Sequence, residues 1–234
     1  MKIWTFLRSL QQRVALAVLA LVCAAGGLSG CASLLPKPVA APTLYTLEAT
    51  AAPATVLPGN APANAAAMAT LVVNTPRADA GFDSPHMMYV REPFKLEYFV
   101  HSEWVDTPSR MLLPLIVLSV GKAGAFKAVV PATIAATGEL TLDSEIVRLQ
   151  QDFNAKPSRV VFTVRVYVLD TQTRKTIAWR ELEAVVAATS DDPAGGVIAA
   201  HRAVQIALQQ VTGFCIEAEK LLQATRQDAR SIKR

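Results

Sequence analysis

The cysteines of this 234-residue chain are its most reactive side chains, and their surroundings differ. Cys31 follows Leu28, Ser29 and Gly30, and a cysteine thiol is the best nucleophile available here for taking up a diacylglyceryl group. The small residues Ser29 and Gly30 would let a peptidase approach the bond that precedes Cys31. The pattern therefore predicts that Cys31 is lipidated and becomes the first residue of the mature protein.

The residues before Cys31 have the composition of an export leader. Three basic residues and no acidic one precede a 12-residue apolar run, Val14 to Ala25. This run is shorter than the ~20 residues that a membrane-spanning helix needs. Residues 28–31 resemble a bacterial lipobox, so residues 1–30 are predicted to be a lipoprotein signal peptide that is removed. The alternative is a chance cysteine in an ordinary secretory signal or a membrane anchor.

The charge of the predicted mature chain is close to neutral, although the pI of the whole chain is 9.1. The leader holds three of the 23 Lys and Arg residues and none of the 19 acidic residues, which leaves 20 against 19. Removing residues 1–30 from 234 leaves 204, enough for one domain with a sizeable core. Because no strong basic footprint remains, no nucleic-acid partner is expected.

The remaining candidates for chemistry are few. Cys23 would be lost with the leader, which leaves Cys215 without an intramolecular partner. A lone cysteine in an exported protein is usually buried and inert, and an intermolecular bridge is the alternative. His86 is expected in a turn, His101 after a strand and His201 on the apolar stripe of the last helix. A structural role is expected for all three histidines.

Neither a nucleophile elbow, nor a Walker A loop, nor a His/Cys metal spacing occurs in the sequence. The pair Asp191-Asp192 reads as a helix cap rather than a metal site. We therefore predict that the protein is not an enzyme and has no catalytic residue and no metal site. The expected cofactor is none, apart from the covalent lipid on Cys31.

The hydrophobic pattern predicts how the rest of the chain is organised. Residues 31–43 are a Pro/Ala-rich tether, and its twelve residues 32–43 reach at most ~40 Å. The domain is predicted over residues 44–216, with a low-complexity insertion at 49–68 and a charged tail at 217–234 that extends the last helix or frays. Strands are expected at 44–47, 71–73, 87–91, 95–99, 126–130, 139–153, 160–169 and 177–187.

Two helices complete the predicted elements. Thr107-Pro108 begins a helix that runs to about Val120, and Pro114 is expected to kink or shorten it. Asp192-Pro193 begins a second helix with apolar residues at helical spacing. A switch of apolar parity near Ile146 predicts a bulge or bend in a long strand. The fold class predicted is α/β: a two-layer sandwich with two helices on one face of a mainly antiparallel or mixed sheet.

Several short motifs then carry a family resemblance. They are Gly81 to Pro85, Met88 to Pro93, Leu96 to Phe99, Glu103-Trp104 and Pro108. In their order and spacing these motifs resemble the ABC-type transport auxiliary lipoprotein family, which includes PqiC/YmbA-type lipoproteins. The resemblance covers about residues 31 to 216. It implies a non-catalytic lipoprotein that faces the periplasm and works with an ABC transporter and its MCE-domain (mammalian cell entry) protein in lipid transport between membranes.

The resemblance also suggests a location and a binding surface. Asp after the lipidated cysteine tends to retain such proteins in the inner membrane, and Ala32 stands there, so anchoring in the outer membrane is expected. Phe82, Tyr89, Arg91 and Trp104 are the candidate interface for the MCE-domain partner, since Tyr, Trp and Arg are common anchors. Core packing with one salt bridge is the other interpretation of these residues.

Other functional readings stay open at this point. A homo-oligomer is a further assembly that the sequence leaves open. An outer-membrane assembly or cell-envelope structural lipoprotein without a transporter is the main alternative function. An enzyme of unknown reaction is the third, and it would need a buried polar constellation that the sequence does not display.

Overall fold

The computed structural model describes residues 41–48, 68–134 and 137–232. The predicted signal peptide, the tether up to residue 40 and the lipidation candidate Cys31 lie outside the described residues, as does the predicted insertion from 49 to 67. The account below concerns the unit that begins at Pro42.

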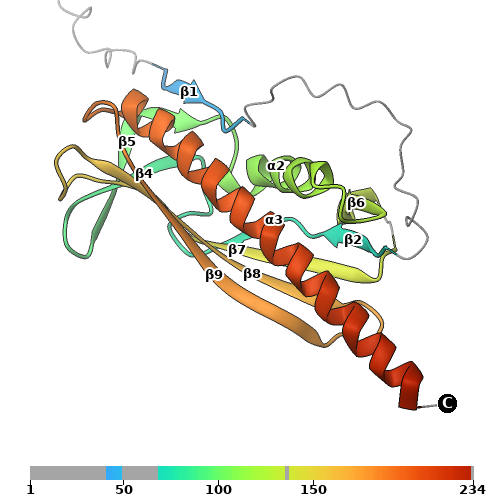
Figure 1. The fold of residues 1–234 in the computed structure, drawn as a ribbon. Helices are drawn as coiled ribbons and strands as arrows, with labels where there is room; N and C mark the ends of the chain where they lie inside the picture. The colour runs from blue at the N-terminus through green and yellow to red at the C-terminus, as the bar shows by residue number, and fades with distance from the viewer. Residues whose placement is uncertain (1–40, 49–67, 135–136, 233–234) are drawn as a thin grey trace, which may run out of the picture. The chain divides into compact units, whose positions relative to one another are not determined.

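In the described part of this unit, nine strands form one mixed sheet (Figure 1). The strands are β1 (Thr43–Tyr45), β2 (Thr70–Val73), β3 (Arg77–Ala78), β4 (His86–Glu92), β5 (Lys95–Trp104), β6 (Ala128–Pro131), β7 (Leu140–Asp152), β8 (Arg159–Asp170) and β9 (Thr176–Ala187). β7 is antiparallel to β8, which is antiparallel to β9. The other edge of β7 pairs in parallel with β2, β3 and β4 in succession. β4 then pairs with β5, β5 with β1, and β2 with β6.

The predicted change of parity in β7 is confirmed. Leu142 and Ile146 are fully buried, and beyond them burial passes to Leu149 and Gln151, which have the opposite parity. The register with β8 shifts between Ile146 and Arg148, so a bulge turns the second half of the strand over. Because of this bulge, both halves of β7 bury their apolar residues.

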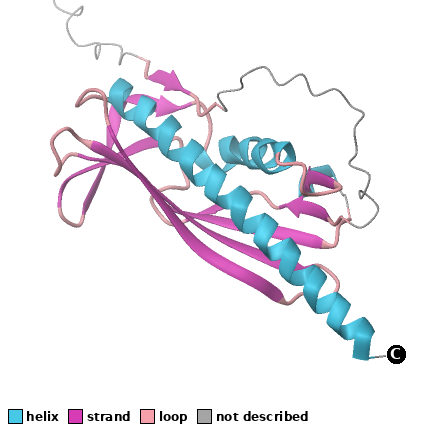
Figure 2. Ribbon diagram, in the orientation of Figure 1, coloured by secondary structure: helices cyan, strands magenta, loops and turns pink. Residues whose placement is uncertain are grey.

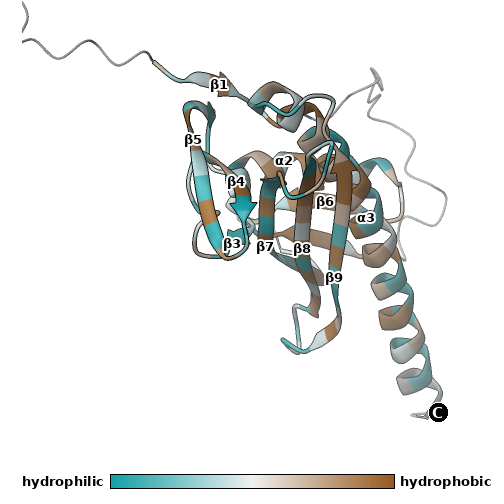
Figure 3. Ribbon diagram, turned by 90° about the vertical axis from the view of Figure 1, so that its left-hand side faces the viewer, coloured by the Kyte–Doolittle hydropathy of each residue, from teal (hydrophilic) through white to brown (hydrophobic). Residues whose placement is uncertain are grey.

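Two helices, α2 (Pro108–Lys122) and α3 (Pro193–Ile232), cover one face of the sheet (Figure 2). α3 packs on β7, β8 and β9, while α2 packs on β2, β3 and β6 and against α3. Hydrophobic residues follow β8 and β9 where these strands run beside α3 (Figure 3). Burying this apolar face is the main stabilising contribution, at about 25 cal/mol per Å² of apolar surface. The predicted fold class, an α/β sandwich with a mixed sheet and two helices, is confirmed.

The expected shortening of the first helix by Pro114 is wrong, since α2 runs over 15 residues with Pro114 inside it, while the alternative, a kink, stays a prediction. Proline removes the hydrogen bond to the carbonyl four residues earlier, that of Arg110. Arg110 and Pro114 are both exposed, so water can reach the freed carbonyl. The tail from residue 217 continues α3 to Ile232. Of the two predicted outcomes, an extended helix and a frayed end, the structure has the extended helix.

The predicted cap of the last helix is confirmed. The carboxylate of Asp192 accepts a hydrogen bond of 2.7 Å from the backbone N–H of Gly195 in the first turn of α3. Asp191 accepts one of 2.7 Å from the N–H of Ser158, which ties this loop to the turn between β7 and β8. These hydrogen bonds lower the pKa of both carboxyls.

Two of the histidine placements are wrong. His86 lies within β4 and His101 within β5, because these strands pair over a longer range than their sequence patterns indicate. His201 lies on α3 as predicted, and its Nε2 is 2.7 Å from the carbonyl oxygen of Thr46 just after β1. Cys215 is fully buried, as expected, and burial raises the pKa of its thiol to about 12.

Candidate functional site

The hairpin of β4 and β5 positions the candidate site. Glu92 pairs with Lys95 across a two-residue turn, Pro93-Phe94, and Phe94 has a φ of 66°. A positive φ at the third turn position, after a proline, is typical of a type II turn and is usually taken by glycine. The ring of Phe94 is fully exposed at the tip. β7 supports the hairpin from the side, since Tyr89 pairs in parallel with Gln151.

One arginine and three aromatic side chains meet on this hairpin and at the end of β7: Tyr89, Arg91, Phe99 and Phe153, called here the Arg91 cluster. The ring centroids of Tyr89 and Phe99 are 4.5 Å apart, and those of Tyr89 and Phe153 are 5.8 Å apart. The guanidinium carbon of Arg91 lies 4.9 Å from the Tyr89 centroid and 5.2 Å from the Phe153 centroid. Arg91 is thus held over two rings by cation–π contacts.

The charges beside Arg91 are already paired with one another. Lys95 Nζ lies 3.6 Å from Glu92 and 3.3 Å from Glu97. The hydrogen bond to Glu97 and the charges of both carboxylates raise the pKa of Lys95. Arg91 is exposed and, among the described residues, takes part in no ion pair. Its guanidinium therefore faces solvent with unused donors.

The structure divides the four candidate interface residues into two groups. Tyr89 is half-buried and Arg91 is exposed, and these two lie in contact. Trp104 is only 4% exposed and Phe82 9%, and both belong to the hydrophobic core. The candidate interface of four residues thus needs a correction, because Phe82 and Trp104 pack in the hydrophobic core and are not exposed to a partner.

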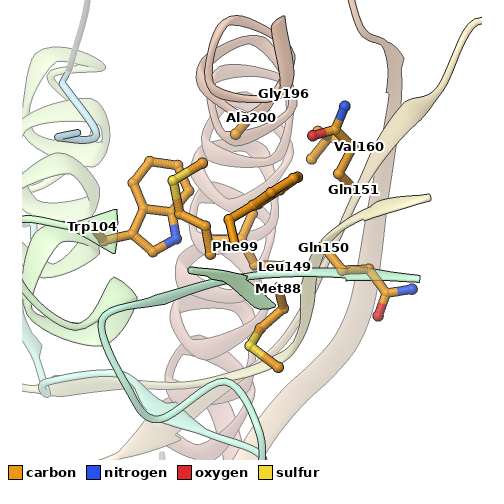
Figure 4. Close-up of a pocket in the computed structure, with 10 residues that line it drawn as sticks. Met88, Phe99, Trp104, Leu149, Gln150, Gln151, Val160, Gly196 and Ala200 are labelled. Atoms are coloured by element: carbon orange, nitrogen blue, oxygen red, sulfur yellow. The ribbon is translucent and has the colours of Figure 1, made fainter. Parts of the chain in front are cut away.

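Trp104 nevertheless supports the Arg91 cluster from below. Trp104 and Phe99 lie side by side and face Gly196 and Ala200 near the start of α3 (Figure 4). A cavity of about 20 Å³ lies between them. A space of this size holds about one water molecule, so this cavity has no room for a lipid chain.

Sequence reasoning missed Phe99 and Phe153 as members of the cluster. Phe153 is 64 positions beyond Tyr89 in the chain, and its N–H donates to the carbonyl of Val90 at 2.9 Å. The local pattern that bore on Phe99 was its spacing of two and four residues from Glu97 and Lys95. This spacing places the three side chains on one face of β5. The parallel pairing of β4 with β7, which brings Phe153 to Tyr89, leaves no pattern in the sequence.

A second arginine lies on the face of the sheet that α2 and α3 leave open. Arg165 on β8 contacts Glu181 on β9 at 2.7 Å and Glu145 on β7 at 3.0 Å. Tyr167 and Trp179 stack beside it with centroids 6.3 Å apart. Together, Glu145, Arg165 and Glu181 are called here the Arg165 ladder. The hydrogen bond to Glu181 raises the pKa of Arg165, which therefore stays charged.

The described ranges also bear on metal binding and on membrane spanning. No group of three or more His, Cys, Asp or Glu side chains there could hold a metal ion. Neither α2 nor any other described helix is long and apolar enough to cross a membrane. Among the described residues, the Arg91 cluster combines an exposed arginine with a half-buried tyrosine, two residue types that are common anchors of protein-binding sites.

The fold is a two-layer α/β domain with an arginine–aromatic cluster at one end of its sheet. Residues 45–212 match the model of the family described as "ABC-type transport auxiliary lipoprotein component". The chain belongs to this family. The resemblance drawn from the motifs around Tyr89-Val90-Arg91-Glu92-Pro93 is thereby confirmed.

Solved structures support the fold. Protein XCC0632 from Xanthomonas campestris, of family DUF330, is 18% identical with a TM-score of 0.60, over 69% of this chain and 88% of that one. A second, described as an uncharacterized protein, is 10% identical with a TM-score of 0.57, over 75% and 99% of the respective chains. A search of curated protein sequences finds no relative of this chain.

Proposed function

We propose that this protein is the lipid-anchored accessory of an MCE/ABC-type system for lipid transport between membranes. It docks on the MCE-domain protein through the exposed part of the Arg91 cluster and catalyses no reaction itself. The family membership supports the transport role. The single observation that supports docking is the exposed Arg91, which lies over Tyr89 and Phe153 and has no ion-pair partner among the described residues.

The small cavity that Phe99 and Trp104 line is not the pocket of a lipid carrier. A carrier must enclose an acyl chain, and ligand pockets usually have ~300–1,000 Å³. The cavity between Phe99 and Trp104 has about 20 Å³. The docking role uses the surface of the domain and needs no such enclosure.

The anchor of the proposed accessory is the lipid on Cys31, in the outer membrane. Two or more acyl chains hold a protein firmly at a membrane, whereas one chain binds only marginally. Mass spectrometry of the mature N-terminus tests the anchor: a lipidated Cys31 is expected, and Cys31→Ser should leave the precursor uncleaved. An unmodified N-terminus elsewhere would contradict it, and membrane fractionation on a sucrose gradient tests the outer-membrane location.

Docking is tested by titrating the mature lipoprotein in detergent against the MCE-domain protein encoded beside it. Saturable binding is expected, and light scattering of the lipoprotein alone reports whether it is a homo-oligomer. The control is an MCE-domain protein from an unrelated system in the same cell. Equal binding to both, or binding to neither, would contradict the proposed function.

A further inference from the structure

Arg91 is held in one place yet lacks an anionic partner among the described residues. Two rings, those of Tyr89 and Phe153, confine its guanidinium within 4.9 Å and 5.2 Å of their centroids. A side chain that is already ordered loses less conformational entropy when it binds. Its planar fork of N–H groups has the geometry that matches a carboxylate with two parallel hydrogen bonds.

We infer that Arg91 is the receptor for an acidic side chain, Asp or Glu, of the protein partner. This inference rests on the proposed function, because it names the chemistry of the docking partner. The carboxylate would bind the guanidinium end-on. The apolar atoms next to that carboxylate would contact the rings of Tyr89, Phe99 and Phe153, which are partly exposed around it.

Arg180 shows that this fold already combines a ring contact with a carboxylate at one arginine. Its guanidinium carbon lies 5.1 Å from the centroid of Phe214, and its Nη2 pairs with Glu217 at 3.0 Å. Arg91 has the ring contacts but, among the described residues, no carboxylate within ion-pair distance. A carboxylate of the partner would supply to Arg91 what Glu217 supplies to Arg180.

The neighbouring charges favour one acidic side chain over an anionic lipid surface. Glu92 and Glu97 lie beside Arg91, with side chains 68% and 29% exposed, and share the single charge of Lys95. They would repel a surface of many negative charges. Segments that bind anionic lipid typically carry clusters of about four to eight Lys or Arg residues.

The test is a titration of mature lipoprotein variants in detergent against the neighbouring MCE-domain protein. Arg91→Ala is expected to weaken binding about 30-fold or more, as the loss of an interface anchor does. Arg91→Lys keeps the charge but loses the planar fork, so binding is expected to fall about tenfold. The matched control is Arg110→Ala on α2, an exposed arginine that pairs with Asp106 and is not a member of the cluster, which should bind as the wild type does. Thermal melts run in parallel confirm that each variant is folded.

The partner residue is found by charge reversal. Arg91→Glu should abolish binding, and replacing one Asp or Glu of the partner by Arg should restore it. Wild-type binding that is unchanged in Arg91→Ala and Arg91→Lys overturns this inference and the Arg91 cluster as the docking site, and it leaves only the docking on the MCE-domain protein intact. Absence of wild-type binding overturns both. In a separate arm, the chain with Cys31→Ser is mixed with vesicles of 30% phosphatidylglycerol in phosphatidylcholine. Arg91-dependent vesicle binding there would identify a lipid headgroup as the ligand and overturn the inference.

Discussion

Two arginines of this protein lie beside aromatic pairs, and they differ in whether carboxylates of the described chain pair with them. Arg165 lies between Glu145 and Glu181 in the middle of three antiparallel strands, next to Tyr167 and Trp179. Arg91 lies over Tyr89 and Phe153 at the end of a hairpin, with no carboxylate within ion-pair distance among the described residues.

Arg165 is thus a structural arginine, whereas Arg91 is available for binding. The Arg165 ladder joins three strands of one sheet, so its ion pairs are made when the sheet forms. Arg91 adds little to the fold through charge, since nothing within the described chain pairs with it. An aromatic pair beside an arginine is thus no sign of function by itself; the unpaired guanidinium is the feature that distinguishes the two regions.

The largest effect is expected from the core beneath the Arg91 cluster. Trp104→Ala should lower the free energy of unfolding by about 3–5 kcal/mol, as large core truncations do, because Trp104 is 4% exposed. Urea denaturation measures this loss. Tyr89→Ala is the comparison on the surface and should cost much less. A loss below about 1 kcal/mol for Trp104→Ala would return Trp104 to the candidate interface.

The start of α3 gives the next largest effect, since it closes the same end of the sheet. A Cβ at Gly196 would overlap the amide of Gln151 on β7, so Gly196→Ala should cost about 1–3 kcal/mol. Gly213→Ala in the same helix is the matched control, because nothing lies within 4 Å of its Cβ position. It should stabilise the protein by up to about 1 kcal/mol. Equal changes of the melting temperature for the two substitutions would show that the close approach of Gly196 to Gln151 does not limit the packing of α3 on β7.

Arg165→Ala and Arg91→Ala test the comparison directly. Arg165→Ala leaves Glu145 and Glu181 facing each other, so the melting temperature should fall, and less so in 1 M salt than at low salt. Arg91→Ala should change the melting temperature less and show little salt dependence. The affinity for the partner should fall for Arg91→Ala and stay unchanged for Arg165→Ala. A larger loss of stability for Arg91→Ala would reverse the assignment of the two arginines.

The smallest effect concerns the acidic cap of α3, near the Arg91 cluster. The hydrogen bond from the Gly195 N–H lowers the pKa of Asp192 below its ordinary 3.8. A carboxyl with a lowered pKa in the folded state stabilises that state above about pH 4, and this contribution is lost as the pH falls through the lowered value. Asp192→Asn should therefore be less stable than the wild type at pH 7, and the two should converge once the pH has fallen below the lowered pKa of Asp192. A stability difference that is independent of pH would contradict the ionised cap.

Much of the architecture could be predicted from local patterns in the sequence. The alternation from Val160 to Val168 predicted β8, and the parity switch near Ile146 predicted the bulge, because a strand repeats every two residues. The apolar spacing along 197–215 predicted a helix on the sheet for the corresponding reason. The family motifs added the transport role. These features depend on neighbours within a few residues, and such neighbours are visible in the sequence.

What only the tertiary structure decided is which distant residues meet. β1 pairs with residues 102–104, and this pairing extends β5 and takes Trp104 into the core. β4 pairs with the end of β7, and this pairing brings Phe153 to Tyr89 and Arg91. The register of two strands some 60 residues apart follows from the packing of the whole sheet against α2 and α3. For this reason the sequence by itself determined that Arg91 lies beside Tyr89, while the fold decided that no carboxylate of the described residues pairs with its guanidinium.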